Sequence, residues 1–591
     1  MRGRRQRVAS LAVAAAAATV LGAPALGTAP AAAAAKKPPR RIEVKIKSQS
    51  ADAKQVKASY VSLLAPLPAA AGPRPKGCDR IGYLRFRDAR GPRKARKADA
   101  VFVTMPGIFA GAGSLDIFAR NMVRTAHAHG RHVEVWTLDR RSNCLEDHYG
   151  VDAGKKRRNY RLAMKYYYHG AAINGRKFAG FRSQQDAQFL KAVGLDQTVR
   201  DEYTVIKRGM PRKLRRKKVF CGGHSLGGPL TTAFAGWDFD GNAKTKRDAG
   251  YNQCAAFFAL DTRLNGSTSG GGSGSGGSGG GDSVGLANFF AAASNGSPYV
   301  DAPPFTPETI QAVPLTALAA FIQPRAKSDV INLLPNDSNF QVTLRTLFSR
   351  NAQNAITQMP SIRDFRTTNE AALGATFDDN SSPVTILRTS LGTFAGGPVA
   401  QKSWPAPYNG EAVSGLIDGK HLMIPIAPHG PLYTWWHYNQ FGKPGTPVQK
   451  DDSGHRFTSG RSEVTAIHQF ARSIFESPAD FAEQYFPLRL LADQQDAGNG
   501  DRSGSLANYR YNGIPKRAQF YADAQNGIEE GSDPPPLKHK HNMWVKLPGY
   551  NHIDVATAAL RQRGGRHEIE SARLWKFART IIGPRKHHHR H

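Results

Sequence analysis

Short apolar runs, separated by polar and helical stretches, recur near both ends of this chain. Ala100–Met105 and Val133–Leu138 have the length and composition of buried strands, and a helical pattern lies between them. Ile81–Phe86 alternates as an edge strand would. Further strands are expected at 255–260, 518–522 and 544–547. Strands that alternate with helices predict an α/β fold with a mostly parallel central sheet, helices on both faces, and chemistry at the carboxyl ends of its strands.

The apolar run that begins at Val219 leads into Gly223–Gly227, which reads GHSLG. A serine at a sharp turn from strand to helix has its hydroxyl exposed above the sheet, and flanking glycines fit where a Cβ would clash. The N–H of Leu226, at the start of the expected helix, can stabilise an oxyanion. Ser225 is therefore the predicted nucleophile, although a glycine-rich turn with a chance serine has the same pattern.

The N-terminus has the pattern of an export signal. Several arginines precede the alanine-rich apolar run Val8–Leu21, and Ala33–Ala35 offers a cleavage site. We expect residues 1–35 to be a signal peptide and the protein to be secreted or associated with the cell envelope. Residues 36–78 are rich in Lys, Pro and Ala and are predicted to be a flexible basic leader.

The formal net charge of +35 favours nonspecific attraction to anionic cell-wall polymers or membrane surfaces. No motif for specific nucleic-acid recognition accompanies it, and no metal or cofactor is predicted. The four cysteines are too few for a disulfide scaffold. Cys78 and Cys144 lie in polar segments and form the expected pair, whereas Cys221 and Cys254 lie in predicted strands and are expected to pack as small hydrophobes.

The order of strand, Pro106–Gly107 loop, helix, strand, serine turn, strand, insertion, strand and histidine loop resembles the α/β-hydrolases. The resemblance implies a first half of the core at 79–264 and a second half at 508–582. By position it makes the N–H of Ile108 the second oxyanion donor. It also makes His552, in the loop after the last strand, the general base.

The acid that orients the histidine is harder to predict. The family usually has a carboxylate after the penultimate strand, where this chain has Asn526. Some members have it one strand earlier, where Asp261 ends the strand that follows the serine strand. We expect Asp261 to be the acid, with Asp523 and then Glu529 as alternatives.

The two halves enclose a Gly/Ser linker at 265–282 and an insertion at 283–507, which the resemblance implies is a lid. The histidine-rich end, 583–591, is expected to be a disordered tail. A charged cluster, Asp139–Asp147, lies at the predicted active edge of the sheet. We interpret it as an ion-pair network that braces the loop; recognition of a polar head group by Arg140 or Arg141 is the alternative.

These features together predict a secreted serine hydrolase, similar to bacterial esterases and lipases, that cleaves a small or lipid-like carboxylic ester through an acyl-enzyme. Ser225, His552 and Asp261 are the expected catalytic residues, and Leu226 and Ile108 the oxyanion donors. A secreted serine peptidase would use the same groups. A catalytically silent cell-wall-binding protein on a hydrolase scaffold is the alternative outside enzymes.

Overall fold

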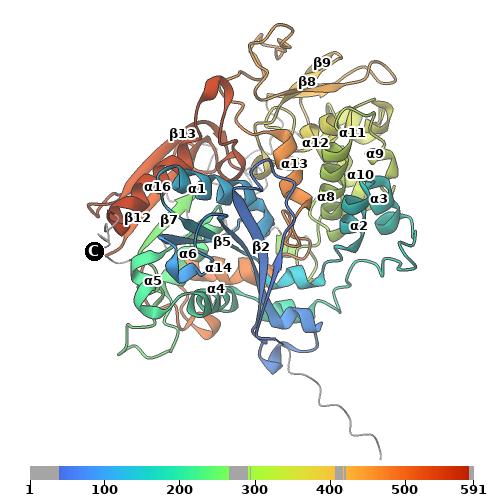
Figure 1. Cartoon of the computed structure of the whole chain (residues 1–591). Helices are drawn as coiled ribbons and strands as arrows, with labels where there is room; N and C mark the ends of the chain where they lie inside the picture. Colours follow the sequence, from blue (N-terminus) through green and yellow to red (C-terminus); the bar gives the residue numbers. More distant parts are fainter. Residues whose placement is uncertain are drawn as a thin grey trace, which may run out of the picture. The chain divides into compact units, whose positions relative to one another are not determined.

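The predicted apolar runs become strands of one central sheet in a computed structural model of the chain (Figure 1). The structure describes residues 39–264, 290–292, 294–405, 417, 421–514 and 516–584. The predicted signal peptide, the linker and residues 585–591 of the tail lie outside this range. Among the described residues, nine strands form the sheet in the order β1(Arg41–Lys45), β2(Val56–Leu64), β3(Arg80–Asp88), β5(Val133–Leu138), β4(Ala100–Met105), β6(Val219–His224), β7(Ala256–Leu260), β12(Ala518–Asn526) and β13(Met543–Asn551).

From β5 to β13 in this order, each strand is parallel to the next one. Strands β1, β2 and β3 are antiparallel to theirs, and β3 is antiparallel to β5. The sheet is therefore mostly parallel, as the alternation of strands and helices predicts. Because parallel strands end at the same edge, the turns that follow β4, β6, β7 and β13 come together there.

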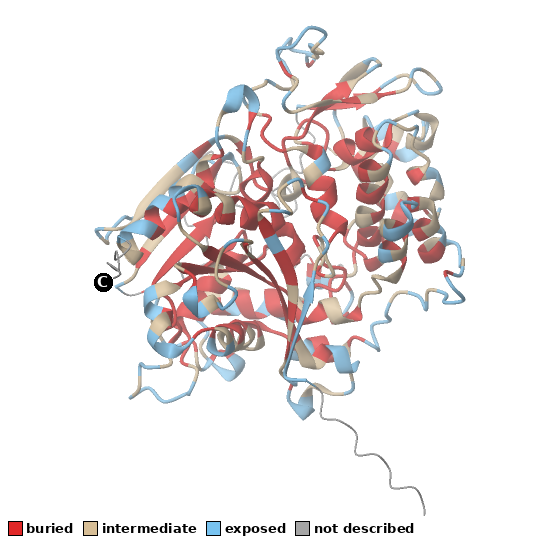
Figure 2. Ribbon diagram, viewed as in Figure 1, coloured by how far each residue is buried: buried red, intermediate tan, exposed pale blue. Residues whose placement is uncertain are grey.

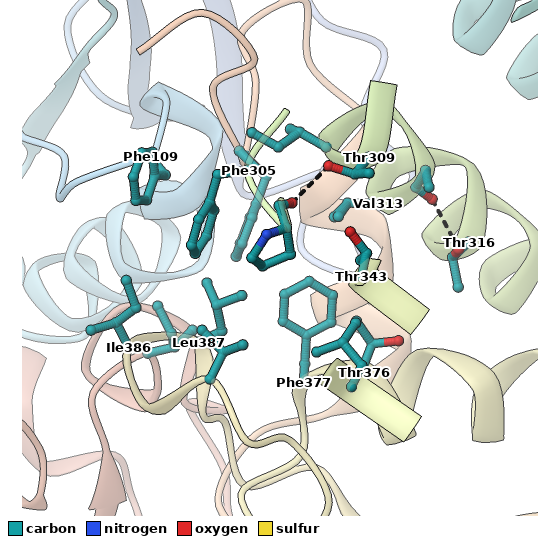
Figure 3. Close-up of a pocket in the computed structure, with 18 of the residues that line it drawn as sticks. Phe109, Phe305, Thr309, Val313, Thr316, Thr343, Thr376, Phe377, Ile386 and Leu387 are labelled. Atoms are coloured by element: carbon teal, nitrogen blue, oxygen red, sulfur yellow. Dashed lines mark hydrogen bonds between the residues drawn. The ribbon is translucent and has the colours of Figure 1, made fainter. Parts of the chain in front are cut away.

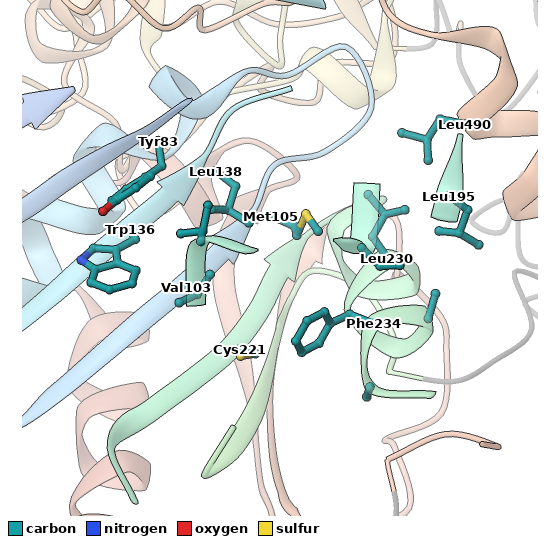
Figure 4. Close-up of a cluster of buried hydrophobic side chains, with 14 of the residues drawn as sticks. Tyr83, Val103, Met105, Trp136, Leu138, Leu195, Cys221, Leu230, Phe234 and Leu490 are labelled. Atoms are coloured by element: carbon teal, nitrogen blue, oxygen red, sulfur yellow. The ribbon is translucent and has the colours of Figure 1, made fainter. Parts of the chain in front are cut away.

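Helices cover both faces of the sheet. Along β4, Val103 and Met105 pack into one buried cluster and Phe102 into another, as the period of two along a strand requires. The first cluster includes side chains of α4(Leu195–Gly209), α6(Gly227–Gly236) and α14(Leu488–Gly498), as Figure 4 shows for Leu195, Leu230 and Leu490. The second includes side chains of α1(Asp116–Ala128), α15(Asp554–Thr557) and α16(Ile569–Ile582).

Two expectations about the N-terminal part are wrong. Residues 41–64, predicted as part of a flexible leader, form β1 and β2 and extend the sheet. The predicted edge strand Ile81–Phe86 is consequently an interior strand, β3, which pairs with β2 on one side and β5 on the other. The reason is visible in β2, where Val56, Val61 and Leu63 are buried in the sheet's two hydrophobic clusters.

A second helical layer, here called the cap, has its own buried cluster apart from the sheet (Figure 2). It contains α2(Tyr149–Arg157) and α3(Tyr160–Tyr168) together with helices of the insertion. These two helices, predicted to belong to the first half of the core, are therefore part of the cap. The insertion contributes α8(Pro307–Ile322), α9(Val330–Leu333), α10(Ser338–Phe348), α11(Ala352–Thr357), α12(Asn369–Phe377), α13(Ile467–Phe475), and the strand pairs β8(Gly392–Ala395) with β11(Thr434–His437) and β9(Val399–Lys402) with β10(Leu422–Pro425). Outside the cap, the short helix α5(Arg212–Lys218) directly precedes β6. None of the described helices is both long and apolar enough to cross a bilayer.

Both pairs of cysteines are disulfide-bonded. The expected bond between Cys78 and Cys144 is present, with 5.2 Å between the Cα atoms. Cys221 and Cys254, expected as free hydrophobes, form a second bond, with 6.0 Å between the Cα atoms. The expectation is wrong because Cys254 lies just before β7, the parallel neighbour of the β6 strand that carries Cys221.

Candidate active site

Ser225 lies in a strained turn between β6 and α6. Its φ of +55° is in the left-handed region, which costs a residue other than glycine free energy. The two glycines of the motif allow the turn, since a Cβ on Gly223 would lie 2.4 Å from the carbonyl carbon of Gly227 and one on Gly227 would lie 2.4 Å from the carbonyl oxygen of Met105. The turn thus holds the Ser225 side chain at the carboxyl edge of the sheet, where it lines a cavity.

His552 and Asp261 meet beside this turn. The imidazole Nδ1 of His552 lies 2.6 Å from Oδ2 of Asp261, within the hydrogen-bond range expected for a histidine and its orienting acid. The Asp261 carboxylate is fully buried and also accepts the backbone N–H groups of Ala524 and Ile528, both at 3.0 Å. A Cβ on Gly527 would lie 2.1 Å from Oδ2, so the loop needs glycine there. The end of β12 and the loop after it, where the family usually has its acid, here supply donors to Asp261.

The alternative acids point elsewhere. Asp523 accepts hydrogen bonds from Arg263, at 2.8 Å, and from the indole N–H of Trp544, at 2.6 Å. Glu529 pairs with the same Arg263 at 3.1 Å, and burial raises its pKa to about 7. Asn526 is exposed. Asp261 is therefore the carboxylate that the structure brings to His552.

His224, inside the serine motif, is a neighbour of His552, the predicted base. Its ring stacks on that of His552 with 4.4 Å between the centroids, and its Nε2 lies 2.9 Å from the His552 carbonyl oxygen. Burial, and secondarily the nearby His552, lower the pKa of His224 to about 3. His224 is therefore neutral at physiological pH and helps to hold the histidine loop.

The backbone N–H groups of Ile108 and Leu226 are available beside the serine. Neither donates a hydrogen bond to any acceptor in the described part of the chain. Gly107 packs directly against the serine, because a Cβ on Gly107 would lie 3.0 Å from the Cβ of Ser225. Two N–H groups without acceptors beside the predicted nucleophile can bind the negative oxygen of a tetrahedral intermediate.

Arg140 braces the loop that carries Ile108. Its guanidinium donates to the carbonyl oxygens of Pro106, Gly107 and Ala110, at 2.6 to 3.0 Å, and to the carboxylate of Glu483 at 2.8 Å. The Arg140 side chain is buried, so it does not face the substrate. Arg141 has a similar structural role, because it binds Asp201 and two backbone carbonyls. The interpretation of the charged cluster as a bracing network agrees with these contacts.

Replacing Arg140 by Met is expected to lower the free energy of unfolding by about 3–5 kcal/mol, because the buried Glu483 carboxylate loses its charged partner. The ratio of kcat/KM between charged and neutral esters should stay the same. Urea unfolding and a pair of matched esters measure the two effects. Arg176→Met is the control: its pair with Asp147 is exposed, so we expect a loss below about 1 kcal/mol. A changed ester ratio would instead assign Arg140 to substrate recognition.

An apolar cavity of about 130 Å³ lies between the sheet and the cap, and Ser225 and His552 are among the residues that line it. Figure 3 shows part of this lining. Four threonines also line the cavity, but each hydroxyl donates to a backbone carbonyl oxygen within hydrogen-bond distance. Their polarity is thus satisfied within the protein, and the cavity suits an apolar group. The apolar lining shown in Figure 3 includes Phe109, Phe305, Val313, Phe377, Ile386 and Leu387, and the four threonines are Thr309, Thr316, Thr343 and Thr376.

Sequence reasoning missed several residues that build the site. Glu483, which holds Arg140, lies more than 300 residues from it in the chain, so no local pattern connects them. The donors Ala524 and Ile528 act through backbone groups, which leave no mark in the side-chain pattern. Gly527 was the one sequence feature that could have indicated this arrangement, since a glycine just after a strand often permits another group to approach the backbone closely.

No family model matches this chain, and no curated protein matches it. Solved structures similar to it include a lipase in an open form, with 10% identity over 92% of this chain and 100% of the lipase chain, at a TM-score of 0.27. They also include the alpha/beta hydrolase GrgF from Penicillium sp. sh18 (9% identity, 92% and 99% covered, TM-score 0.26) and esterase E22 (9% identity, 89% and 99% covered, TM-score 0.28).

The fold of this chain is assigned from its own sheet and turns. Its central sheet is mostly parallel, with β5 preceding β4 in the strand order and helices on both faces. A serine at a positive φ connects β6 to α6, and the aspartate and the histidine follow it in that order along the chain. The protein therefore has the α/β-hydrolase fold.

Proposed function

We propose that the protein is a serine hydrolase that cleaves a carboxylic ester with an apolar acyl chain through an acyl-enzyme. The observation that carries the proposal is the hydrogen bond between His552 and Asp261 beside Ser225, at one end of an apolar cavity. A silent binding protein on the same scaffold would have no need for a buried carboxylate aimed at the histidine.

In the proposed reaction, the Ser225 hydroxyl attacks the ester carbonyl while Nε2 of His552 accepts its proton. The N–H groups of Leu226 and Ile108 bind the oxyanion, and the Asp261 carboxylate stabilises the imidazolium. His552 then protonates the leaving alcohol, and a water molecule, activated by the same histidine, hydrolyses the acyl-enzyme. No hydrogen bond joins Ser225 to His552 in the described structure; such contacts often tighten only when substrate binds.

The cavity predicts which part of the substrate is recognised. Its apolar walls offer burial to a hydrocarbon chain, at roughly 0.8 kcal/mol per methylene group. A series of esters with the same alcohol and increasing acyl length should therefore show kcat/KM rising with length until the cavity is filled. Equal kcat/KM values along the series, or cleavage of peptide amides in preference to esters, would contradict this proposal.

Val313→Trp is expected to shorten the preferred acyl chain. Val313 lies on α8 and lines the cavity, and the indole ring that replaces its side chain would occupy part of that space. We expect kcat/KM to fall by about 10-fold or more for a dodecanoyl ester and to change little for an acetyl ester. Val342→Trp is the control, since Val342 is 46% exposed and does not line the cavity. A loss of the same size for both esters would place the acyl chain elsewhere.

We also propose that the protein acts outside the cytoplasm, on the basis of the export pattern in residues 1–35. Its net charge of +35 would hold it near anionic surfaces. Attraction of this kind weakens with salt, because mobile ions screen it. Release of the enzyme from isolated cell envelopes by salt would support the idea, and binding that does not change with salt would contradict it.

A further inference from the structure

A group of three carboxylates lies outside the catalytic residues, where α12 ends and before α13 begins. Asp378, Asp379 and Glu463 each place one oxygen atom within 4.8 Å of the others. Asp378 and Glu463 are completely buried. Like charges at such separations repel each other strongly in a protein interior, so this arrangement needs compensation from another group.

The amide of Asn380 stands among the three carboxylates. Its Nδ2 lies 3.1 Å from Oδ1 of Asp378, 2.8 Å from Oδ1 of Asp379 and 3.4 Å from Oε1 of Glu463. An amide group is neutral and has two protons, so it cannot balance three negative charges or satisfy three acceptors fully. Rotation of the amide by 180° would turn its oxygen into the group as a further oxygen ligand.

One oxygen of the group has no partner at all. Oε2 of Glu463 is buried and makes no hydrogen bond. No Lys, Arg or His among the described residues forms an ion pair with any of the three carboxylates; Arg388 acts on Asp379 only at longer range. A buried carboxylate oxygen without a partner is uncommon in a native protein, and a bound cation would satisfy it together with the neighbouring carboxylates.

We propose that Asp378, Asp379 and Glu463 bind a divalent cation, and that this cation is Ca²⁺. The donors are all oxygen atoms, with neither histidine nor cysteine among them, which favours Ca²⁺, Mg²⁺ or Mn²⁺ over zinc. Ca²⁺ accepts irregular sets of carboxylate and amide oxygens, whereas Mg²⁺ demands near-ideal octahedral geometry and retains its waters. Three carboxylates from two segments, Asp378–Asp379 and Glu463, with Asn380 as a fourth oxygen donor, form such an irregular set.

The site is joined directly to the histidine loop. Nδ2 of Asn551 donates to Oδ2 of Asp379 at 2.8 Å, and Asn551 immediately precedes His552. On the other side, Phe377 precedes Asp378 and lines the cavity. A cation here would tie the cap to the loop of the proposed base. Binding of the cation stands by itself, whereas its effect on turnover rests on the proposed function.

The experiment compares protein treated with EGTA with the same protein after addition of CaCl₂. Isothermal titration should show saturable Ca²⁺ binding with a Kd of about 10⁻³ M or tighter, and saturation should raise Tm by about 3 °C. MgCl₂ should bind more weakly. Absence of both the heat and the shift in Tm would overturn the site, and this readout needs no activity.

Glu463→Gln tests the assignment of ligands. In EGTA this variant should melt at or above the temperature of the wild type, because it removes a buried charge. Its Ca²⁺ affinity should fall at least about 10-fold, through loss of one carboxylate ligand. Asp240→Asn is the matched control, since Asp240 is itself exposed, belongs to a separate acidic group, and should leave Ca²⁺ binding at Glu463 unchanged. Equal affinity in Glu463→Gln and wild type would overturn the assignment.

Measurement of ester turnover distinguishes Ca²⁺ binding at the three carboxylates from an effect of that binding on catalysis. We expect Ca²⁺ to raise kcat of the EGTA-treated wild type and to have a smaller effect on Glu463→Gln at the same concentration. Calcium binding that leaves kcat unchanged would overturn the coupling to His552. Calcium binding by a protein that cleaves no ester would contradict the proposed function and leave the cation site standing.

Discussion

Replacement of Ser225 or His552 by Ala is expected to lower kcat by on the order of 10⁴ or more, because nucleophile and base act as one unit. The double variant should be no slower than either single variant, since removal of the first member already abolishes the covalent route. Steady-state rates on the preferred ester measure all three. The Ser225→Ala protein should keep its Tm, because the serine hydroxyl makes no hydrogen bond in the described structure.

Two results would contradict this expectation. Retention of most of the wild-type activity by Ser225→Ala would mean that the turn is structural and that the nucleophile lies elsewhere. Additive losses in the double variant would mean that Ser225 and His552 contribute to separate steps. His224→Gln serves as the control for the histidine, because His224 contacts His552 only through ring stacking and its backbone carbonyl oxygen. This variant should lose far less activity than His552→Ala.

Asp261→Asn is expected to reduce kcat by on the order of 10²–10⁴ at neutral pH. Three donors converge on this carboxylate: the N–H groups of Ala524 and Ile528, and Nδ1 of His552. An Asn side chain has only one oxygen, so its NH₂ group must face at least one of these donors. Where it faces His552, the ring must accept at Nδ1 and hold its proton at Nε2, the tautomer that cannot take the serine proton.

Asp523→Asn is the matched control for this variant. Asp523 is buried within β12, directly before the Ala524 that donates to Asp261, but its partners are Arg263 and Trp544. We expect its kcat to stay within about 10-fold of the wild type, with the larger effect on stability. A loss at Asp523 as large as that at Asp261 would make Asp523 the functional acid.

The strands that can be predicted from the sequence are those with a clear local run of apolar residues. The apolar runs at Ala100–Met105 and Val133–Leu138 became β4 and β5 with the predicted bounds, because strands buried on both faces need continuous apolar sequence. Strand β2 has a weaker pattern within a region rich in Lys and Pro, and composition alone assigned that region to a leader. The cap helices α2 and α3 were placed in the core because nothing in their sequence tells which layer they join.

The candidate site was predictable through chain order, and unpredictable where it depends on distant contacts. Ser225 was found from its glycines, and Asp261 and His552 from their places after strands. The bracing of the loop by Arg140 and Glu483, and the disulfide of Cys221 with Cys254, depend on which elements become neighbours in space. The carboxylate group at Asp378 was missed for the same reason, because Glu463 reaches it from a separate segment.

Labelling with a fluorophosphonate tests the central claim most directly, because the probe reacts covalently only with an activated serine. Mass spectrometry of the digested protein then identifies the modified residue. The account predicts one adduct, on Ser225, that is absent from Ser225→Ala and forms more slowly in Asp261→Asn. A folded wild-type protein that stays unlabelled, or an adduct on another serine, would contradict it.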